Sequence, residues 1–292
     1  MEKVRKVLVT GAGGQLGHEL RRMTAGQELF VFTDYIPSDG VLQLDICDAE
    51  AVSGCVGRND IGTIINCAAY TDVERAEDEP DRCRRINCEG VAVLAEAASG
   101  AGAALIQIST DYVFDGSKHT PYTETDVPAP LSVYGGSKAE SEKIVTESGA
   151  AGIIIRTAWL YSPYGRNFLK TMLALGATRE SINVVNDQTG SPTSAADLAG
   201  VILSLLPLAP ARKGEIYNYS NEGACSWYDF SCEIMRQAGL ACKVFPVSSS
   251  EYPQKAVRPA YSYLDKKKIA TELSMDIPRW QDSLSRCLTR II

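Results

Sequence analysis

The sequence contains one pair of residues well suited to proton transfer, Tyr134 and Lys138. They form the pattern Y-x-x-x-K, and residues spaced in this way share one face of a helix. A phenol with a pKa of about 10 donates its proton poorly at neutral pH, but a nearby ammonium stabilises the phenolate and lowers that pKa. The phenol can then protonate a carbonyl oxygen while a hydride reaches the carbonyl carbon. Because the spacing is common by chance, the alternative is a tyrosine at a helix start beside a solvated lysine.

Polar residues follow two expected strands at the points where each strand ends. Thr110 comes directly after the strand-like run 105–109, and the run 61–67 leads into Asn-Cys-Ala-Ala-Tyr-Thr at 66–71. The carboxyl ends of parallel strands meet at one edge of a sheet, where ligands of such folds bind. We therefore expect these residues to share a crevice with the tyrosine and lysine. The Thr110 hydroxyl can bond a substrate ketone and hold it for attack; a hydroxyl in a turn is the alternative.

A glycine-rich segment lies between the first expected strand and the first expected helix. Gly11, Gly14 and Gly17 form the pattern G-x-x-G-x-x-G. Such a loop allows a tight turn and close backbone approach to a pyrophosphate, and the helix N-terminus offers unpaired N–H groups to the phosphates. Strand, loop and helix occur in the right order, which favours a dinucleotide site over a tight turn without a ligand.

Two aspartates follow at positions suited to the adenosine half of a dinucleotide. Asp34 ends the second expected strand, 17 residues after Gly17, and an acid there can bond the ribose hydroxyls of NAD(H). It would repel a 2′-phosphate, yet a role as a turn or cap residue before Pro37 is the alternative. Asp45 precedes an expected helix, where it could cap that helix or approach the adenine. The cofactor is therefore predicted as NADPH or NADH.

Strands alternate with helices through the first half of the chain, and each strand is almost entirely apolar. This pattern predicts an α/β fold with a Rossmann-type doubly wound parallel sheet covered on both faces. After Trp159 the elements become shorter and prolines separate them, which predicts a smaller, interwoven α/β substrate-binding lobe. We assign residues 1–160 to the dinucleotide-binding domain, with a return of the chain near 195–220, and residues 161–292 mainly to the lobe. The expected strands are 4–10, 29–33, 61–67, 105–109 and 153–157.

Composition limits the classes of partner and compartment. The 292 residues are 45% hydrophobic and carry a net charge of -7, which argues against nucleic acid or an anionic membrane surface as a partner. No apolar run approaches the roughly 20 residues of a membrane-spanning helix, and Met1–Val4 does not begin a signal peptide. Nine cysteines occur without a C-x-x-C pair, which suits reduced thiols. We expect a cytoplasmic protein.

Longer motifs resemble the extended short-chain dehydrogenase/reductases and, among them, the RmlD-like dTDP-4-dehydrorhamnose reductase family. The resemblance covers almost the whole chain. Its most specific parts are S-T-D-Y-V-F at 109–114 and D-Q-T-G-S-P-T at 187–193. Further matching stretches are the glycine loop 11–17, 66–77, R-T-A-W-L-Y at 156–161, Asn167-Phe168, S-W-Y-D-F at 226–230 and Arg258-Pro259.

The resemblance implies reduction of the C4 ketone of a dTDP-linked 4-dehydro-6-deoxy-L-sugar to dTDP-L-rhamnose. It implies Thr110, Tyr134 and Lys138 as catalytic residues, with Tyr134 as the proton donor and Lys138 also bonding the nicotinamide ribose. The candidate cofactor-binding residues are Gly11, Gly14, Gln15, Leu16, Gly17, Asp34, Asp45, Ile46, Ala68, Ala69, Tyr70, Thr71, Tyr134 and Lys138. The candidate substrate-binding residues are Thr110, Asp111, Trp159, Asn167 and Arg258. Core packing is the alternative role for Trp159.

The sequence leaves two properties open: whether the protein binds magnesium and how many subunits it forms. Certain family members bind magnesium between subunits through glutamates, and Glu19 lies where one such glutamate would be. An exposed glutamate on the first helix is the alternative, so we predict no metal site. A homodimer is compatible with the sequence. Arg166, Lys170 and Arg258 are candidates for binding the substrate diphosphate, because an acidic protein needs local cations there.

Two other functions compete with the reductase. A sugar-nucleotide epimerase or dehydratase shares the glycine loop and Y-x-x-x-K, but dehydratases typically carry an acid pair where this sequence has Asp111-Tyr112. A non-catalytic regulatory subunit of methionine adenosyltransferase, of the beta type, is built on a similar scaffold. The presence of Thr110, Tyr134 and Lys138 together favours retained chemistry.

Overall fold

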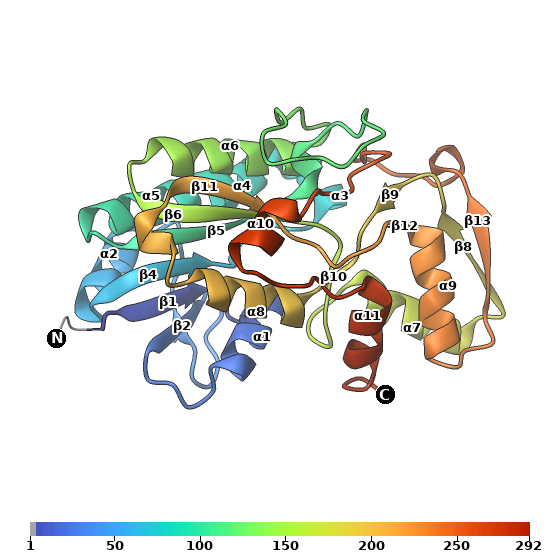
Figure 1. The fold of residues 1–292 in the computed structure, drawn as a ribbon, viewed down its shortest axis with the longest axis horizontal. Coiled ribbons are helices and arrows are strands. Elements are labelled where there is room, and N and C mark those ends of the chain that lie inside the picture. Colours follow the sequence, from blue (N-terminus) through green and yellow to red (C-terminus); the bar gives the residue numbers. More distant parts are fainter. Residues whose placement is uncertain (1–3) are drawn as a thin grey trace.

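The computed structural model describes residues 4–292. Met1–Lys3, on which the expectation that the chain does not begin with a signal peptide partly depends, lie outside the described residues. Within the described chain, the main sheet has seven strands in the order β11-β6-β5-β4-β1-β2-β3, all paired in parallel (Figure 1). The strands are β1 (Lys6–Thr10), β2 (Phe30–Asp34), β3 (Leu42–Gln43), β4 (Ile61–Asn66), β5 (Ala104–Thr110), β6 (Ala151–Thr157) and β11 (Lys213–Asn218). The order runs outward from β1 in both directions, which confirms the predicted doubly wound sheet.

Helices cover both faces of this sheet, and residues along a strand alternate between the two cores. In β1, Val7 and Val9 pack into one core while Leu8 packs into the other. Burial on both faces explains why the strands are apolar without a polar alternation. The first core includes side chains of α1 (Gln15–Met23) and α8 (Ala195–Leu205). The second includes side chains of α2 (Ala49–Arg58), α5 (Gly90–Gly100) and α6 (Val133–Glu147).

A smaller lobe lies beside the carboxyl edge of the sheet, at the right of Figure 1. Its core joins α7 (Phe168–Thr178), α9 (Trp227–Gln237) and α11 (Trp280–Leu288) with β8 (Ser181–Val185). Strand β8 pairs in parallel with β13 (Lys243–Val247). The remaining short strands are β7 (Leu160–Tyr161), paired with β10 (Thr193–Ser194), and β9 (Thr189–Gly190), paired with β12 (Cys225–Ser226). The remaining helical segments are α3 (Val73–Ala76), α4 (Pro80–Arg84), η1 (Arg85–Glu89), η2 (Asp111–Val113), η3 (Ala209–Ala211), η4 (Ser249–Glu251) and α10 (Lys267–Glu272).

After β6 the chain forms part of the lobe. It then returns to the sheet domain with α8 and β11, and afterwards forms the rest of the lobe. Helix α8 packs against α1, and β11 extends the sheet beside β6. These two elements occupy the region near 195–220 where the sequence predicts a return. The boundary at residue 160 stays a prediction.

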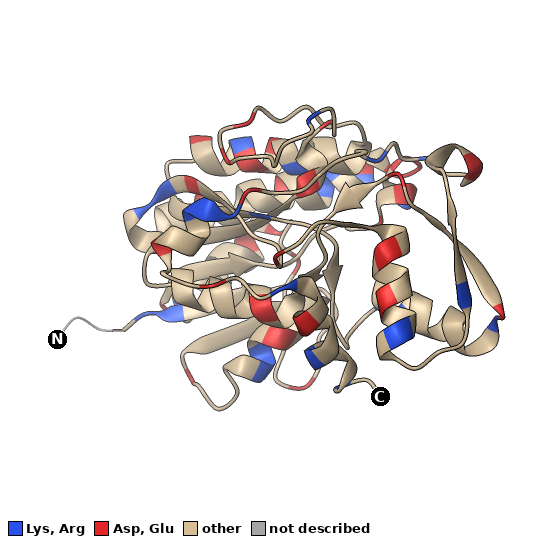
Figure 2. Cartoon of the chain, turned by 45° about the vertical axis from the view of Figure 1, so that its right-hand side comes forward, with Lys and Arg blue, Asp and Glu red and all other residues tan. Residues whose placement is uncertain are grey.

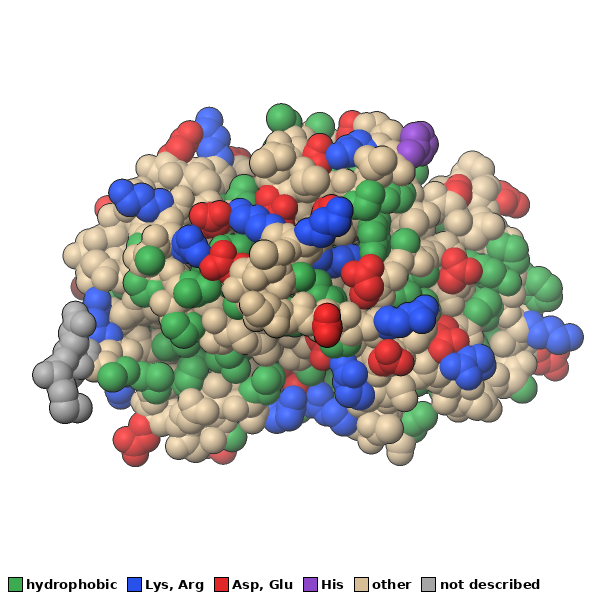
Figure 3. Space-filling model, viewed as in Figure 1, with side chains coloured by type: hydrophobic (Ala, Val, Ile, Leu, Met, Phe, Trp, Pro, Cys, Tyr) green, Lys and Arg blue, Asp and Glu red, His purple; other side chains and the backbone are tan. Residues whose placement is uncertain are grey.

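Lys and Arg residues and Asp and Glu residues are interspersed along the helices of both parts of the molecule (Figure 2). The face drawn in Figure 3 has the same mixture, with apolar side chains between the charges. Given the net charge of -7, an anionic ligand would depend on cations placed locally in a cavity. Within residues 4–292, no helix combines the length and the apolar character that crossing a membrane requires.

Glu19 on α1 is buried, and the alternative of an exposed glutamate is wrong. Its Oε1 accepts a hydrogen bond from Arg290 Nη1 at 2.7 Å, and its Oε2 accepts one from Arg22 Nε at 2.9 Å. Two guanidinium groups offset the cost of removing the carboxylate from water. Arg290 follows α11, so this ion pair fixes the end of the lobe against the first helix of the sheet domain. In the described part of the chain, no group of three or more His, Cys, Asp or Glu residues could hold a metal ion.

Arg290→Ala should lower the free energy of unfolding by about 1–3 kcal/mol, because it leaves the buried Glu19 carboxylate with one partner fewer. Urea unfolding followed by circular dichroism measures the change. Lys267→Ala is the matched control, since it breaks an ion pair with Asp265 in which the lysine is 91% exposed. Equal stability of the two variants would contradict this account of Glu19.

Candidate active site

One cavity of about 650 Å³ lies at the carboxyl edge of the sheet, between the sheet and the lobe. It is lined by all three candidate catalytic residues, Thr110, Tyr134 and Lys138. It also contains most of the other predicted site residues: Gly11, Gly14, Gln15, Leu16, Gly17, Ala68, Ala69, Thr71, Asp111, Trp159, Asn167 and Arg258. Residues from segments far apart in the sequence thus meet where parallel strands end.

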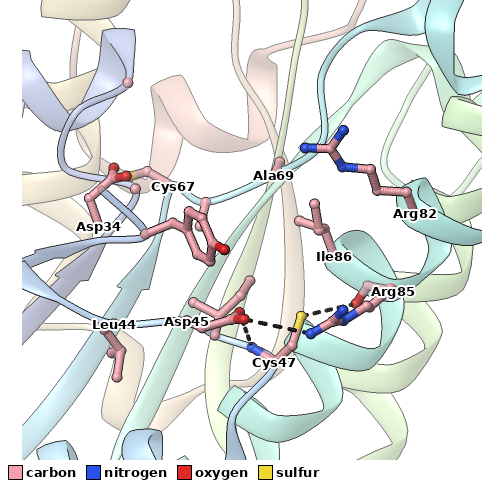
Figure 4. A pocket seen from close by; sticks show the side chains of 14 residues that line it. Asp34, Leu44, Asp45, Cys47, Cys67, Ala69, Arg82, Arg85 and Ile86 are labelled. Atoms are coloured by element: carbon pink, nitrogen blue, oxygen red, sulfur yellow. Dashed lines mark hydrogen bonds and ion pairs between the residues drawn. The ribbon is translucent and has the colours of Figure 1, made fainter. Parts of the chain in front are cut away.

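A second cavity of about 390 Å³ continues from the first, because Gly11, Gly14 and residues 67–69 line both. It contains the predicted residues Asp34, Asp45 and Ile46 (Figure 4). Arg82 and Arg85 border it from α4 and η1, and the sequence analysis missed both cations. Together the two cavities form one continuous site, with the catalytic candidates in the larger cavity and the residues predicted to bind adenosine in the smaller one, which is therefore called the adenosine cavity.

The glycine loop fits a pyrophosphate. Gly11 has φ +66°, and a Cβ placed on it would lie 2.5 Å from the backbone nitrogen of Ala68. Only glycine therefore fits between the first strand and the loop after β4. Helix α1 begins after Gly14 without a side-chain cap, which leaves its first N–H groups directed toward the cavity.

The two aspartates of the adenosine cavity are held by backbone amides. Asp34 accepts from Gly13 N at 2.9 Å and from Ile36 N at 3.2 Å, so it orders the turn and still lies against the glycine loop. Asp45 accepts from the amide of Cys47 at 2.9 Å and lies 3.6 Å from Arg85 Nη2. Asp45 does not cap the following helix, because Asp48 accepts from Ala51 N and caps α2.

Tyr70 differs from the other predicted cofactor residues, because it lines neither cavity. Its hydroxyl donates to Glu79 Oε2 at 3.0 Å, and its ring is buried beside Cys83. Its backbone N–H donates to Asn87 Oδ1 at 2.8 Å. The segment reaches the site through its neighbours Ala69 and Thr71 instead.

The catalytic candidates meet where β5 ends and α6 begins. Thr110 is the last residue of β5, and its hydroxyl donates to Asp111 Oδ1 at 3.1 Å. Tyr134 lies near the start of α6 and lines the same cavity as Thr110, whose hydroxyl acts to lower the pKa of the Tyr134 phenol. Lys138 lies one helical turn further along α6, and its Nζ donates to the carbonyl of Ile108 at 2.6 Å.

Burial dominates the ionisation of both groups on α6. It raises the pKa of Tyr134 above its ordinary value, opposite to the direction expected from the lysine spacing. Burial also lowers the pKa of Lys138 to about 8. Tyr134 therefore holds its proton at neutral pH, as a proton donor must before the reaction.

Two of the candidate substrate-binding residues, Asp111 and Arg258, form hydrogen bonds across the cleft. Asp111 is 1% exposed, accepts from Ser262 Oγ at 2.5 Å, and has a pKa raised to about 6 by burial. Arg258 donates to Glu74 Oε1 at 2.7 Å and to the hydroxyl of Tyr112 at 3.0 Å. The segment around 258–262 thus connects the lobe to the catalytic edge.

Aromatic residues form the lobe side of the cavity. Trp159 adopts a left-handed backbone conformation with φ +48° and stacks on Trp227 with 3.5 Å between ring centroids. Phe168 packs against Trp227 as well. Asn167 caps α7 and donates to Gln15 Oε1 at 2.9 Å, which joins the lobe to the glycine loop. The sequence analysis assigned no role to Trp227; its place beside Trp159 follows from the fold alone.

Comparison with known proteins places these features in a family. The family described as RmlD substrate binding domain matches residues 5–292. The chain is 39% identical to spore coat polysaccharide biosynthesis protein SpsK of Bacillus subtilis, over 97% of this chain and 96% of the relative. It is 38% identical to dTDP-4-dehydrorhamnose reductase of Aggregatibacter actinomycetemcomitans, over 96% of this chain and 97% of the relative. It is also similar to the crystal structure of dTDP-4-dehydrorhamnose reductase from Bacillus anthracis in complex with NADP, with a TM-score of 0.89, 38% identity, and coverage of 98% of this chain and 99% of that chain.

Lys138→Met should raise the free energy of unfolding at pH 7 by an amount on the order of 2 kcal/mol, because the folded state no longer contains a buried ammonium. The folded pKa of about 8 lies below the ordinary value of 10.5, so the wild type itself gains stability as pH rises between these values. The difference between variant and wild type should shrink over that window.

Urea unfolding at several pH values measures this effect. Lys143→Met on the same helix is the control, since the Lys143 side chain is 71% exposed and its removal should leave the pH dependence unchanged. A Lys138 variant less stable than wild type at pH 7 would contradict the account.

Proposed function

Because this chain belongs to the RmlD substrate binding domain family, we propose that it reduces the C4 ketone of dTDP-4-dehydrorhamnose to dTDP-L-rhamnose with NADPH or NADH. The chain is an NAD(P)H-dependent oxidoreductase of nucleotide-sugar biosynthesis. One observation carries the specific proposal: the hydroxyl of Thr110, the phenol of Tyr134 and the ammonium of Lys138 line a cavity that continues into the glycine loop.

The residues of the chain divide the reaction between them. The dinucleotide, when bound along the glycine loop, supplies a hydride to the carbonyl carbon. Tyr134 gives its proton to the carbonyl oxygen, and Thr110 donates a hydrogen bond that orients the same oxygen once its hydroxyl proton turns away from Asp111 Oδ1. Lys138 keeps a positive charge beside the phenolate that forms, until solvent returns the proton to Tyr134.

The lobe supplies the substrate side of the proposal. The stacked rings of Trp159 and Trp227 offer a flat apolar wall for a sugar or a base. Arg166 and Arg258 line the same cavity and are the cations proposed for the diphosphate. Residues 1–160 would thus bind the dinucleotide, and 161–292 would supply most of the substrate contacts. A homodimer and a cytoplasmic location stay predictions.

The adenosine cavity supports the use of either dinucleotide. Asp34 lies where it can accept from the ribose hydroxyls of NADH. Arg82 and Arg85 provide positive charge at the same cavity, which suits the additional phosphate of NADPH. An assay must therefore offer each dinucleotide in turn.

The competing functions are less well supported by this site. A dehydratase would need a second carboxylate after Asp111, but the next residue is Tyr112, whose hydroxyl is bonded by Arg258. A purely regulatory subunit has no need for three reactive side chains in one cavity. An epimerase or dehydratase would return its cofactor unchanged, whereas a reductase releases one oxidised dinucleotide for each product.

Tyr134→Phe should lower kcat by about 100-fold or more, because the ring stays while the proton donor is lost. Absorbance at 340 nm, with freshly generated dTDP-4-keto-6-deoxy-L-sugar, measures the rate, and fluorescence titration measures dinucleotide affinity. That affinity should change little. Tyr252→Phe is the control, since Tyr252 is 51% exposed and lies outside the cavity. Full activity of the Tyr134 variant would remove this residue from the mechanism.

A further inference from the structure

A buried ion pair lies directly behind the catalytic residues, and the mechanism above does not use it. Arg156 donates to Glu142 from Nε at 2.9 Å and from Nη2 at 2.7 Å. The two side chains are 2% and 5% exposed. Ser109 Oγ donates to the same Glu142 carboxylate at 2.5 Å. Glu142 therefore accepts three hydrogen bonds from the ends of two neighbouring strands.

The strand register places these donors one step behind the reacting edge. Ser109 of β5 pairs with Arg156 of β6, and the next pair is Thr110 with Thr157. Because successive side chains alternate, Ser109 and Arg156 lie on the face covered by α6. Glu142 is thus bonded to the residue that immediately precedes the catalytic threonine.

On α6, the Glu142 carboxylate lies on the same face of the helix as the catalytic residues. Tyr134, Lys138 and Glu142 follow one another at single-turn spacing along α6, which runs over β5 and β6 (Figure 1). Lys138 bonds the carbonyl of Ile108, and Glu142 bonds the hydroxyl of Ser109. Two consecutive residues of β5 are therefore joined to two consecutive turns of α6, immediately before Thr110.

Further contacts of the Arg156 side chain show how the ion pair fixes the position of α6 on the sheet. Arg156 also donates to the carbonyl of Glu124 at 3.3 Å and lies 5.0 Å from the centroid of the Phe114 ring. A buried ion pair adds little net stability over an apolar pair of similar size, because both charges must leave water. Its directional hydrogen bonds, by contrast, fix the helix at one place on the sheet.

Glu142 also acts on the charge of Lys138. Burial lowers the pKa of Lys138, and the Glu142 carboxylate opposes that shift. The other groups that face Lys138 are the thiols of Cys83 and Cys88, whose pKa values are raised by burial, so both stay neutral near pH 8.

We propose that Glu142, held by Arg156 and Ser109, is a positioning residue that docks α6 on β5 and so places Tyr134 and Lys138 against Thr110. The proposal rests on the reductase function given above. Glu142 touches neither reactant; it acts through the two catalytic residues that precede it on the helix.

Ser109→Ala tests the docking contact with the smallest change. It removes one hydroxyl and leaves both charges in place, so kcat should fall roughly 10-fold, because small misplacements of reacting groups cost rate. KM and dinucleotide affinity should change less than twofold. Unchanged kcat in this variant would overturn the positioning role.

Glu142→Gln and Glu142→Asp separate charge from geometry. Lys138 is charged below its pKa, so activity that needs the ammonium is lost as pH rises through that value. Without the Glu142 charge, the pKa of Lys138 falls and the alkaline limb of the kcat profile should move down by about 1 pH unit. Glu142→Asp keeps the charge, so its alkaline limb should stay in place while kcat falls.

Glu272→Gln is the matched control, because it breaks the pair between Glu272 and Arg212 away from the cavity. Melting temperatures of all variants show the loss of stability separately from the loss of rate. If the Glu142 variants melt earlier but keep the wild-type kcat and pH profile, the ion pair is purely structural and the proposal is wrong. If Glu142→Gln does not fold, Ser109→Ala still decides. A wild-type protein inactive with every dinucleotide would instead refute the proposed function.

Discussion

The ammonium of Lys138 is buried at the edge of a parallel sheet, and the rest of the site is arranged around it. A charge out of water is costly unless hydrogen bonds and opposite charge replace the lost solvent. The carbonyl of Ile108 and the nearby Glu142 carboxylate provide part of that replacement, and the lowered pKa of Lys138 shows that a cost of burial remains. Glu142 lies on the same helix as Lys138, whereas Ile108 belongs to β5, so α6 must lie close over β5 to bring the Ile108 carbonyl within reach. That closeness also brings Tyr134 to Thr110, so a structural requirement of the lysine produces the catalytic geometry.

The sheet topology supplies the remaining parts at the same edge. The loop after β1, the loop after β4 and the end of β5 all open toward one side, because the strands are parallel. The lobe closes this side through contacts between distant segments, such as Asn167 with Gln15 and Ser262 with Asp111. A dinucleotide cleft and a substrate cavity therefore become one continuous site without a separate catalytic domain.

Local patterns in the sequence predicted five of the seven strands of the sheet, the strand–loop–helix order around the glycine loop and the placement of Tyr134 and Lys138 on one helix, because each depends on residues within one strand, turn or helix; β3 and β11 were not among the expected strands. Gly11 and its neighbours, and the spacing of Tyr134 and Lys138, belong to this class. Contacts between distant segments could not be predicted. Glu19 is buried because Arg290 reaches it from the other end of the chain. Trp227 and Arg82 enter the cavities through tertiary packing, and the raised pKa of Tyr134 reflects burial that no spacing reveals.

The most direct test of this account is the ionisation of Lys138 itself. Lysine Cε resonances of the ¹³C-labelled protein can be followed between about pH 6 and about pH 11, with Lys138→Arg used to assign the signal. We predict that the Lys138 signal titrates near pH 8. A Lys138 signal that titrates at about pH 10.4, as in a solvated lysine, would contradict it.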